Sequence, residues 1–414
     1  MTIQPTLELV PARAATRRDG ETLLPVLVRI SAPAPDPSRE TKRLPLNLSL
    51  VLDRSGSMGG DKLRNAKKAA RFAIEQLGEN DRVSVVAYDD EVRIAAPSQS
   101  VRNRTALLAA IDAIQTGGST NLHGGWLEGG TQVAAHLDPK ALNRVLLLTD
   151  GLANVGETEP KTITKHVAGL SQRGVSTTCL GVGRDFNEDL LLAMAQAGDG
   201  NFYFIEGAAD LERIFRVEMG GLAAQFGQKV SLGIEPRAGS EMADALNDFE
   251  KNELGRFQLP PLVFGRDIEA VVVLRIAPHV GQREVCAFRL AFDVPGESKR
   301  QVVRASLSLP SVGEAEFDSM AQDERVLSAV ALLEAARERE RINADIERGD
   351  MVSALSGLSR AKARVAAAPH AAAVLEQEMG DFDLLESAIE GGDAQIALKR
   401  SKSQSHRRRH SQAD

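Results

Sequence analysis

The chain has 414 residues, of which 43% are hydrophobic and 26% are charged, a composition typical of soluble globular proteins with two or three domains. Fifty basic and 57 acidic residues leave a formal net charge of −7, so the body of the protein is not expected to bind nucleic acid or anionic membranes generally. No apolar run approaches the length of a membrane span, and the first twenty residues lack the apolar core of a signal peptide. We therefore expect a cytoplasmic protein.

Strand patterns begin near the amino terminus. Residues 6–10 and 23–31 alternate or run apolar on either side of a turn-forming segment at 18–20, which predicts a β-hairpin. A polar, proline-rich connector follows at residues 33–41.

A continuous apolar stretch at residues 46–52 predicts a buried parallel strand, and three polar residues follow it at alternate positions: Asp53, Ser55 and Ser57. Ligands of open α/β sheets bind at the carboxyl ends of strands. Glycines in the loop let it curl, so that these oxygens converge on one point. Hard oxygen donors suit Mg²⁺, Mn²⁺ or Ca²⁺. Taken alone, the stretch is also compatible with a Ser/Gly turn that caps a helix beginning near Asp61.

Strands and helices then alternate up to about residue 222, which predicts right-handed βαβ crossovers and a mainly parallel sheet. Two positions in this region add polar groups at element boundaries. Thr120 comes just before a helical pattern, and Asp150 ends the buried strand that begins at residue 145. The further strands are predicted at 82–88, 91–95, 175–182 and 201–205, and the helices at 63–77, 102–114, 122–136, 160–173, 187–197 and 208–222.

The set of Asp53, Ser55, Ser57, Thr120 and Asp150 resembles the metal-ion-dependent adhesion site of the von Willebrand factor type A (VWA) family, which joins a D-x-S-x-S loop to a distant threonine and a distant aspartate. The resemblance covers roughly residues 44–222. It implies a Rossmann-like α/β fold in which the two serines and the threonine bind the metal directly. The two aspartates are then expected to act mostly through water.

Residues 226–309 contain five strand patterns separated by glycine and proline clusters, without an intervening helical period. Such strands need a partner sheet, and the amino-terminal hairpin remains available. We therefore expect one discontinuous β-sandwich, formed by residues 1–43 and 226–312, with a VWA domain at 44–225 inserted in it. The alternative is two separate β pieces.

The remaining chain is rich in alanine, glutamate and arginine and predicts a small α-helical domain at residues 317–393. Residues 394–414 form a polar, basic segment that we expect to be disordered. Arg407–Arg409 in this segment raise the alternative of binding RNA, DNA or an acidic protein by counterion release. A solubilising tail is the simpler interpretation.

Cys179 and Cys286 are the only cysteines, and each lies in an apolar strand pattern. Two distant cysteines form neither a disulfide framework nor a zinc cluster, so we expect two buried free thiols.

The sequence thus predicts a non-enzymatic scaffold that binds a protein partner through Mg²⁺, with a partner Asp or Glu replacing a water molecule on the ion. The resemblance also implies partnership with ATPases of the AAA+ class. Two alternatives remain. A metal-dependent hydrolase would need a general base; His123 follows Thr120 by three residues, but no second histidine stands at ligand spacing. A nucleic-acid binder would act through the basic tail.

Overall fold

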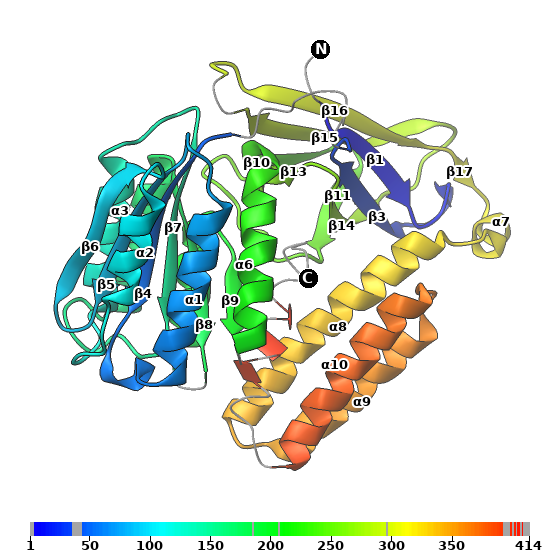
Figure 1. Ribbon diagram of the computed structural model, residues 1–414. Helices are drawn as coiled ribbons and strands as arrows, with labels where there is room; N and C mark the ends of the chain where they lie inside the picture. The colour runs from blue at the N-terminus through cyan, green and yellow to red at the C-terminus, as the bar shows by residue number, and fades with distance from the viewer. Residues whose placement is uncertain are drawn as a thin grey trace. The chain divides into compact units, whose positions relative to one another are not determined.

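The computed structural model describes residues 4–34, 44–183, 186–205, 208–294 and 297–391, together with residues 398, 399, 401, 402, 404, 405 and 408 (Figure 1). The described residues divide into two compact units. One consists of those within Met1–Ser38, Gly227–Val294 and Lys299–Asp414, and the other of those within Arg39–Phe226 and Pro295–Ser298. We call these the β/helical unit and the α/β unit.

The α/β unit is built on a six-stranded sheet with the order β6-β5-β4-β7-β8-β9. Neighbouring strands are parallel except for the antiparallel pair of β5 and β6, so the prediction of a mainly parallel sheet is confirmed. The strands are β4 (Leu46–Asp53), β5 (Arg82–Tyr88), β6 (Val92–Ser100), β7 (Leu142–Thr149), β8 (Val175–Val182) and β9 (Phe202–Ile205).

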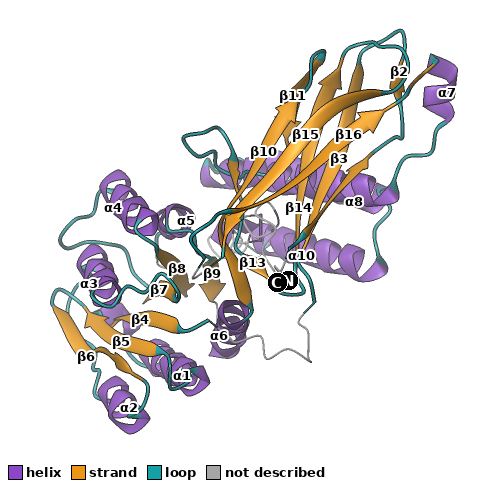
Figure 2. Cartoon of the chain, turned by 90° about the horizontal axis from the view of Figure 1, so that it is seen from above, coloured by secondary structure: helices purple, strands orange, loops and turns teal. Residues whose placement is uncertain are grey.

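Helices cover both faces of this sheet (Figure 2). Residues of α1, α2 and α6 pack in one apolar core, and residues of α3, α4 and α5 pack in a second core on the opposite face. Trp126, the only tryptophan of the chain, is buried in the second core. The helices are α1 (Asp61–Gln76), α2 (Arg104–Asp112), α3 (Leu122–Ala134), α4 (Pro160–Gln172), α5 (Glu188–Ala197) and α6 (Ala208–Ala223), preceded by a 3-10 turn, η1 (Gly56–Met58).

The order of the strands places a topological switch point between β4 and β7. The chain continues from β4 to β5 and β6 on one side, and then returns to form β7 on the other side of β4. Leu52 pairs with Leu148, so that the carboxyl ends of β4 and β7 are level with each other. A crevice for ligands is expected at such a point, and Asp53 and Asp150 stand there.

In the β/helical unit, strands from before and after the α/β unit share one sheet, with the order β1-β3-β14-β11. β3 pairs with β14 from Thr22–Ile276 to Ser31–Asp267. A second sheet has the order β12-β10-β15-β16, with β13 beside β10, and β2 pairs with β17. The strands are β1 (Thr6–Pro11), β2 (Thr16–Arg17), β3 (Thr22–Ser31), β10 (Gln225–Pro236), β11 (Ser240–Ala245), β12 (Phe257–Gln258), β13 (Leu262–Val263), β14 (Asp267–Ile276), β15 (Arg283–Asp293), β16 (Gln301–Leu309) and β17 (Ser311–Val312).

Strands β2, β11 and β17 of this unit were not predicted from the sequence. The segment between β1 and β3 carries the short strand β2, which pairs in parallel with β17, so it is more than a simple hairpin turn. β11 also escaped prediction because none of its residues is fully buried and its sequence, SEMADA, lacks an alternating apolar pattern.

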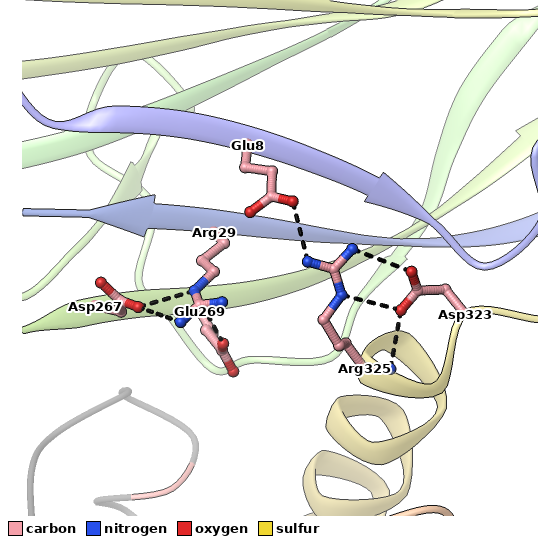
Figure 3. A network of polar contacts seen from close by, with 6 residues as sticks. All are labelled: Glu8, Arg29, Asp267, Glu269, Asp323 and Arg325. Atoms are coloured by element: carbon pink, nitrogen blue, oxygen red, sulfur yellow. Dashed lines mark hydrogen bonds and ion pairs between the residues drawn. The ribbon is translucent and has the colours of Figure 1, made fainter.

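Within residues 297–391, the β/helical unit contains the helices α7 (Glu314–Ser319), α8 (Glu324–Glu347), α9 (Met351–Ala367) and α10 (Ala372–Glu390). Figure 3 shows how the start of α8 is tied to the sheet. Arg325 pairs with Glu8 of β1 at 3.1 Å and with Asp323 at 3.1 Å, and nearby Arg29 pairs with Asp267 across β3 and β14. These pairs are partly exposed to water, so each contributes about 1 kcal/mol or less.

Part of the basic carboxyl-terminal segment is helical and packed, which corrects the expectation of disorder for those residues. Ser405 Oγ donates a hydrogen bond to the carbonyl of Ala336 at 2.9 Å, and Lys402 pairs with Glu347 at 2.8 Å. Arg408 pairs with Glu378. Acceptors on α8 and α10 supply these partners, and the sequence pattern of the segment gives no sign of them. Residues 394–397, 400, 403, 406, 407 and 409–414 of this segment, which include Arg407 and Arg409, lie outside the described part of the chain.

A buried ion pair fixes α6 to the sheet. Arg144 of β7 lies 2.7 Å from Glu218 of α6, and both side chains are at most 6% exposed. Burial alone would raise the pKa of Glu218, but Arg144 and hydrogen bonds from Thr178 and Asn201 hold that pKa below its usual value. Glu218 is therefore charged and fully partnered.

We predict that Glu218→Gln lowers the free energy of unfolding of the α/β unit by about 3 kcal/mol, because it leaves the Arg144 guanidinium buried without a counter-charge. Urea titration followed by the fluorescence of Trp126 reports on this unit, where the single tryptophan is buried. The control is Glu75→Gln on the exposed face of α1. Equal midpoints for the two variants would contradict the prediction.

Candidate metal site at the carboxyl edge of the sheet

Asp53, the last residue of β4, organises the loop that follows it. Its Oδ1 accepts a hydrogen bond from the backbone N–H of Ser55 at 2.8 Å, and its Oδ2 accepts one from the Thr149 hydroxyl at 2.6 Å. The side chain is completely buried. Asp53 thus joins the ends of β4 and β7 and sets the direction in which the serine loop leaves the sheet.

The predicted hydroxyl groups converge beside this carboxylate. Ser55 Oγ and Ser57 Oγ are 3.2 Å apart, and Ser57 Oγ donates a hydrogen bond to Asp150 Oδ1 at 2.8 Å. A Cβ on Gly151 would lie 3.2 Å from Thr120 Oγ1 and 3.7 Å from Ser57 Oγ, so these two hydroxyls flank the bare glycine. Three separate loops therefore bring all five predicted residues to one place.

Lys62 also reaches the site, although the sequence analysis did not include it. Its Nζ lies 2.5 Å from Asp150 Oδ2, while the other oxygen of the same carboxylate accepts the Ser57 hydroxyl. The spacing of five residues after Ser57 places Lys62 in the first turn of α1. That position could have been found by extending the motif into the helix.

A second ion pair holds the loop that carries Thr120. Arg54 Nη2 lies 2.6 Å from Asp89 Oδ1, and Asp89 Oδ2 accepts the backbone N–H of Gly118 at 3.0 Å. The backbone N–H of Thr120 itself donates to Asn154 Oδ1 at 2.8 Å. These contacts come from the loops that carry Arg54, Asp89 and Asn154, and together they position Thr120.

The pKa values of Asp53 and Asp89 are shifted in opposite directions. Burial raises the pKa of Asp53, against the lowering effect of its bonds to Ser55 and Thr149, and the nearby charge of Asp150 raises it further. For Asp89, burial would raise the pKa, but the backbone N–H groups of Gly118 and Glu91 and the Arg54 guanidinium hold it below the usual value. Negative charge on Asp53 is therefore disfavoured unless a cation lies close by.

His123 pairs with a second histidine that the sequence analysis missed. Its Nε2 lies 3.0 Å from Nδ1 of His166 on α4, which is 43 positions away in the chain. In the part of the chain that the structure describes, neither histidine forms a hydrogen bond or an ion pair with the five polar residues of the site. Sequence spacing gave no signal for this pair, because it depends on the packing of α3 beside α4.

The chemistry of the site is that of hydroxyls and carboxylates. Among the residues that the structure describes, no group of three or more His, Cys, Asp or Glu side chains is arranged to hold a metal ion. The five converging residues supply three hydroxyls and only two carboxylates, so most of their oxygens come from serine and threonine. Neutral oxygens and buried acids together suit a hard divalent cation better than a soft one.

The open, mainly parallel α/β sheet belongs to the doubly wound class, whose members bind ligands at the switch point. Residues 47–217 match the family model of the von Willebrand factor type A domain. Two solved structures share the fold over nearly the whole chain. The presence of a VWA domain in this chain is thus supported both by its sequence and by its fold.

The first of these structures is described as von Willebrand factor type A from Catenulispora acidiphila; it is 18% identical, covers 94% of this chain and 90% of its own, and has a TM-score of 0.71. The second, the ArnB paralog VWA2 from Sulfolobus acidocaldarius, is 16% identical, covers 97% of this chain and 98% of its own, and has a TM-score of 0.63. Among curated proteins, the uncharacterized protein sll0103 of Synechocystis is 38% identical over 189 residues, which are 46% of this chain and 44% of the relative. The chain therefore matches less than half the length of that relative.

Two further expectations can be compared with the structure. Cys179 and Cys286 are free and buried, as predicted; burial raises the pKa of both thiols, to about 12 for Cys286. None of the helices in the described part of the chain combines the length and the apolar composition that a membrane span needs.

The close approach of two loops requires glycine at position 117. A Cβ there would lie 1.7 Å from Asp89 Oδ2, which accepts the N–H of Gly118, while Arg54 binds Oδ1 of the same carboxylate. We predict that Gly117→Ala breaks this contact and lowers the free energy of unfolding of the α/β unit by about 1–3 kcal/mol.

The matched control is Gly169→Ala on α4, where an added Cβ meets nothing within 4 Å. That change should be neutral or stabilising by up to about 1 kcal/mol, because alanine favours the helix. Urea midpoints from Trp126 fluorescence compare the two variants. If Gly117→Ala is as stable as Gly169→Ala, the loop contact does not constrain position 117.

Proposed function

We propose that the α/β unit binds a divalent metal ion at Asp53, Ser55, Ser57, Thr120 and Asp150, and through that ion the carboxylate of a protein partner. The observation that carries the proposal is the convergence of these five side chains from three loops at the switch point of the sheet. Protein–protein interaction is also the general role of VWA domains.

The donor set fits the ion that the fold family implies. Ser55, Ser57 and Thr120 would bind it directly as neutral oxygens, and Asp53 and Asp150 would act mostly through water. The raised pKa of Asp53, caused first by burial and also by the charge of Asp150, supports this assignment, because a bound cation would compensate the buried charge. Mg²⁺ is our first choice, and Mn²⁺ and Ca²⁺ accept the same ligands.

Neutral ligands explain why such a site would recognise an acidic partner. Three hydroxyls do not reduce the charge of the ion, so it attracts a further anionic ligand to its open position. A partner Asp or Glu side chain meets that requirement. We favour binding over hydrolysis because the side chains gathered here are hydroxyls, carboxylates in contact with them, and the ammonium of Lys62. The AAA+ ATPase partner and the cytoplasmic location stay predictions.

We further propose that this VWA domain, residues 44–225, is inserted in a β-sandwich formed by residues 1–43 and 226–312 and followed by a helical domain at 317–393. The long pairing of β3 with β14 supports the insertion, since these strands precede and follow the α/β unit. The bonds from Arg337 of α8 to Asp244 of β11, the shorter at 2.6 Å, tie the helices to the same sheets.

Two variants test the metal site. We predict that Mg²⁺ raises the melting temperature of the wild-type protein, and that Ser57→Ala and Asp150→Ala abolish this rise. Ser57→Ala removes a direct oxygen, and Asp150→Ala removes one of two nearby charges. Asp61→Ala is the control, because Asp61 is an exposed acid close by in the chain and pairs with Arg64 on the surface. Thermal unfolding is measured with and without Mg²⁺, with Trp126 fluorescence as the signal.

The same variants test partner binding. The wild-type protein should capture a partner from lysate with Mg²⁺ and release it with EDTA, whereas Ser57→Ala should capture none. A partner that binds equally in EDTA would place the interaction surface elsewhere. Deleting residues 396–414 distinguishes the tail-driven alternative, which predicts steep salt dependence and no effect of EDTA.

A further inference from the structure

Lys62 occupies a special position in the first turn of α1. Its Nζ lies 2.5 Å from Asp150 Oδ2, and its side chain is 32% exposed whereas that of Asp150 is completely buried. The second oxygen of Asp150 accepts the Ser57 hydroxyl at 2.8 Å. One carboxylate therefore binds both a proposed metal ligand and an ammonium group of the protein.

The shape of the neighbouring loop leaves room for this ammonium. A Cβ on Gly183, just after β8, would lie 3.3 Å from Lys62 Cε and 3.5 Å from Nζ. Gly183 also has a φ of +75°, which disfavours any other residue there. The end of β8 thus provides a bare backbone surface along which the lysine side chain reaches Asp150.

We infer that Lys62 is an internal counter-ion that competes with the metal for Asp150 and thereby sets the affinity of the site for divalent cations. This inference rests on the metal site proposed above. A buried carboxylate without a cation is costly, and the Lys62 ammonium compensates its charge when no ion is bound. An incoming ion must either displace this ammonium from Asp150 or bind beside a like charge.

Displacement of the ammonium and binding beside it both weaken the binding of the ion. Displacement removes an ion pair with a buried acid, and coexistence adds repulsion between the ammonium and the ion. The affinity of the site is then lower than its oxygen ligands alone would give. Lys62 is a positioning residue in this account, since it acts on the metal through Asp150.

The test compares Lys62→Gln with Lys68→Gln in the full chain. Lys68 is an exposed residue of the same helix, so both changes remove one positive charge from α1. Isothermal titration with Mg²⁺ and with Mn²⁺ should show a Kd about tenfold lower for Lys62→Gln than for the wild type, after partial screening by solvent is allowed for. Lys68→Gln should stay within about twofold, and Lys62→Arg should retain wild-type affinity.

A second measurement in EDTA tests the counter-ion role without metal. Lys62→Gln should melt below Lys68→Gln, as followed by Trp126 fluorescence, because Asp150 loses its ammonium partner. Structural damage alone would weaken metal binding, so tighter binding by a less stable variant is specific to competition. If the wild type binds the ions and Lys62→Gln binds them equally or more weakly, the competition is refuted while the metal site stands. If no variant binds either ion, both proposals fall.

Discussion

Two carboxylates at the ends of neighbouring parallel strands are the constraint on which the site depends. Asp53 ends β4 and Asp150 follows β7, and both are completely buried. Burial and the nearby charge of Asp150 raise the pKa of Asp53, so the surrounding groups must supply compensation. Thr149, the Ser55 backbone and the Ser57 hydroxyl donate hydrogen bonds, and Lys62 adds a positive charge. The loop after β4 and the start of α1 thus carry the donors and the positive charge that stabilise these two buried carboxylates.

The fold makes this arrangement possible by bringing the strand ends level. β4 lies at the centre of the sheet with β5 and β7 as parallel neighbours, and the loops after all three strands emerge at the same edge. Asp89, just after β5, does not belong to the proposed ligand set. It pairs with Arg54 and holds the backbone of Gly118, and in this way positions the loop that carries Thr120. The glycines of that loop are needed because Asp89 and Asp90 fill the space where side chains would be.

Much of the α/β unit could be predicted from the sequence, because its strands are long apolar runs and its helices have clear periods and caps. The five polar residues could be predicted because each stands at an element boundary, where topology brings strand ends together. The contacts of Asp89 and His166 could not be predicted, since they depend on which helices and loops become neighbours in the folded protein. The packed part of the basic segment was missed for a similar reason: its partners Glu378 and Ala336 are contributed by distant helices.

The most direct test of the central claim is a titration of the protein with Mn²⁺ followed by the relaxation rate of water protons. A site made largely of neutral oxygens should bind Mn²⁺ with exchangeable water in its coordination shell, which enhances relaxation. Adding acetate or a short peptide containing glutamate should then reduce the enhancement, as the carboxylate replaces the water. The Ser57→Ala protein should show neither effect. Tight Mn²⁺ binding that is insensitive to carboxylates, or no binding by the wild-type protein, would contradict the account.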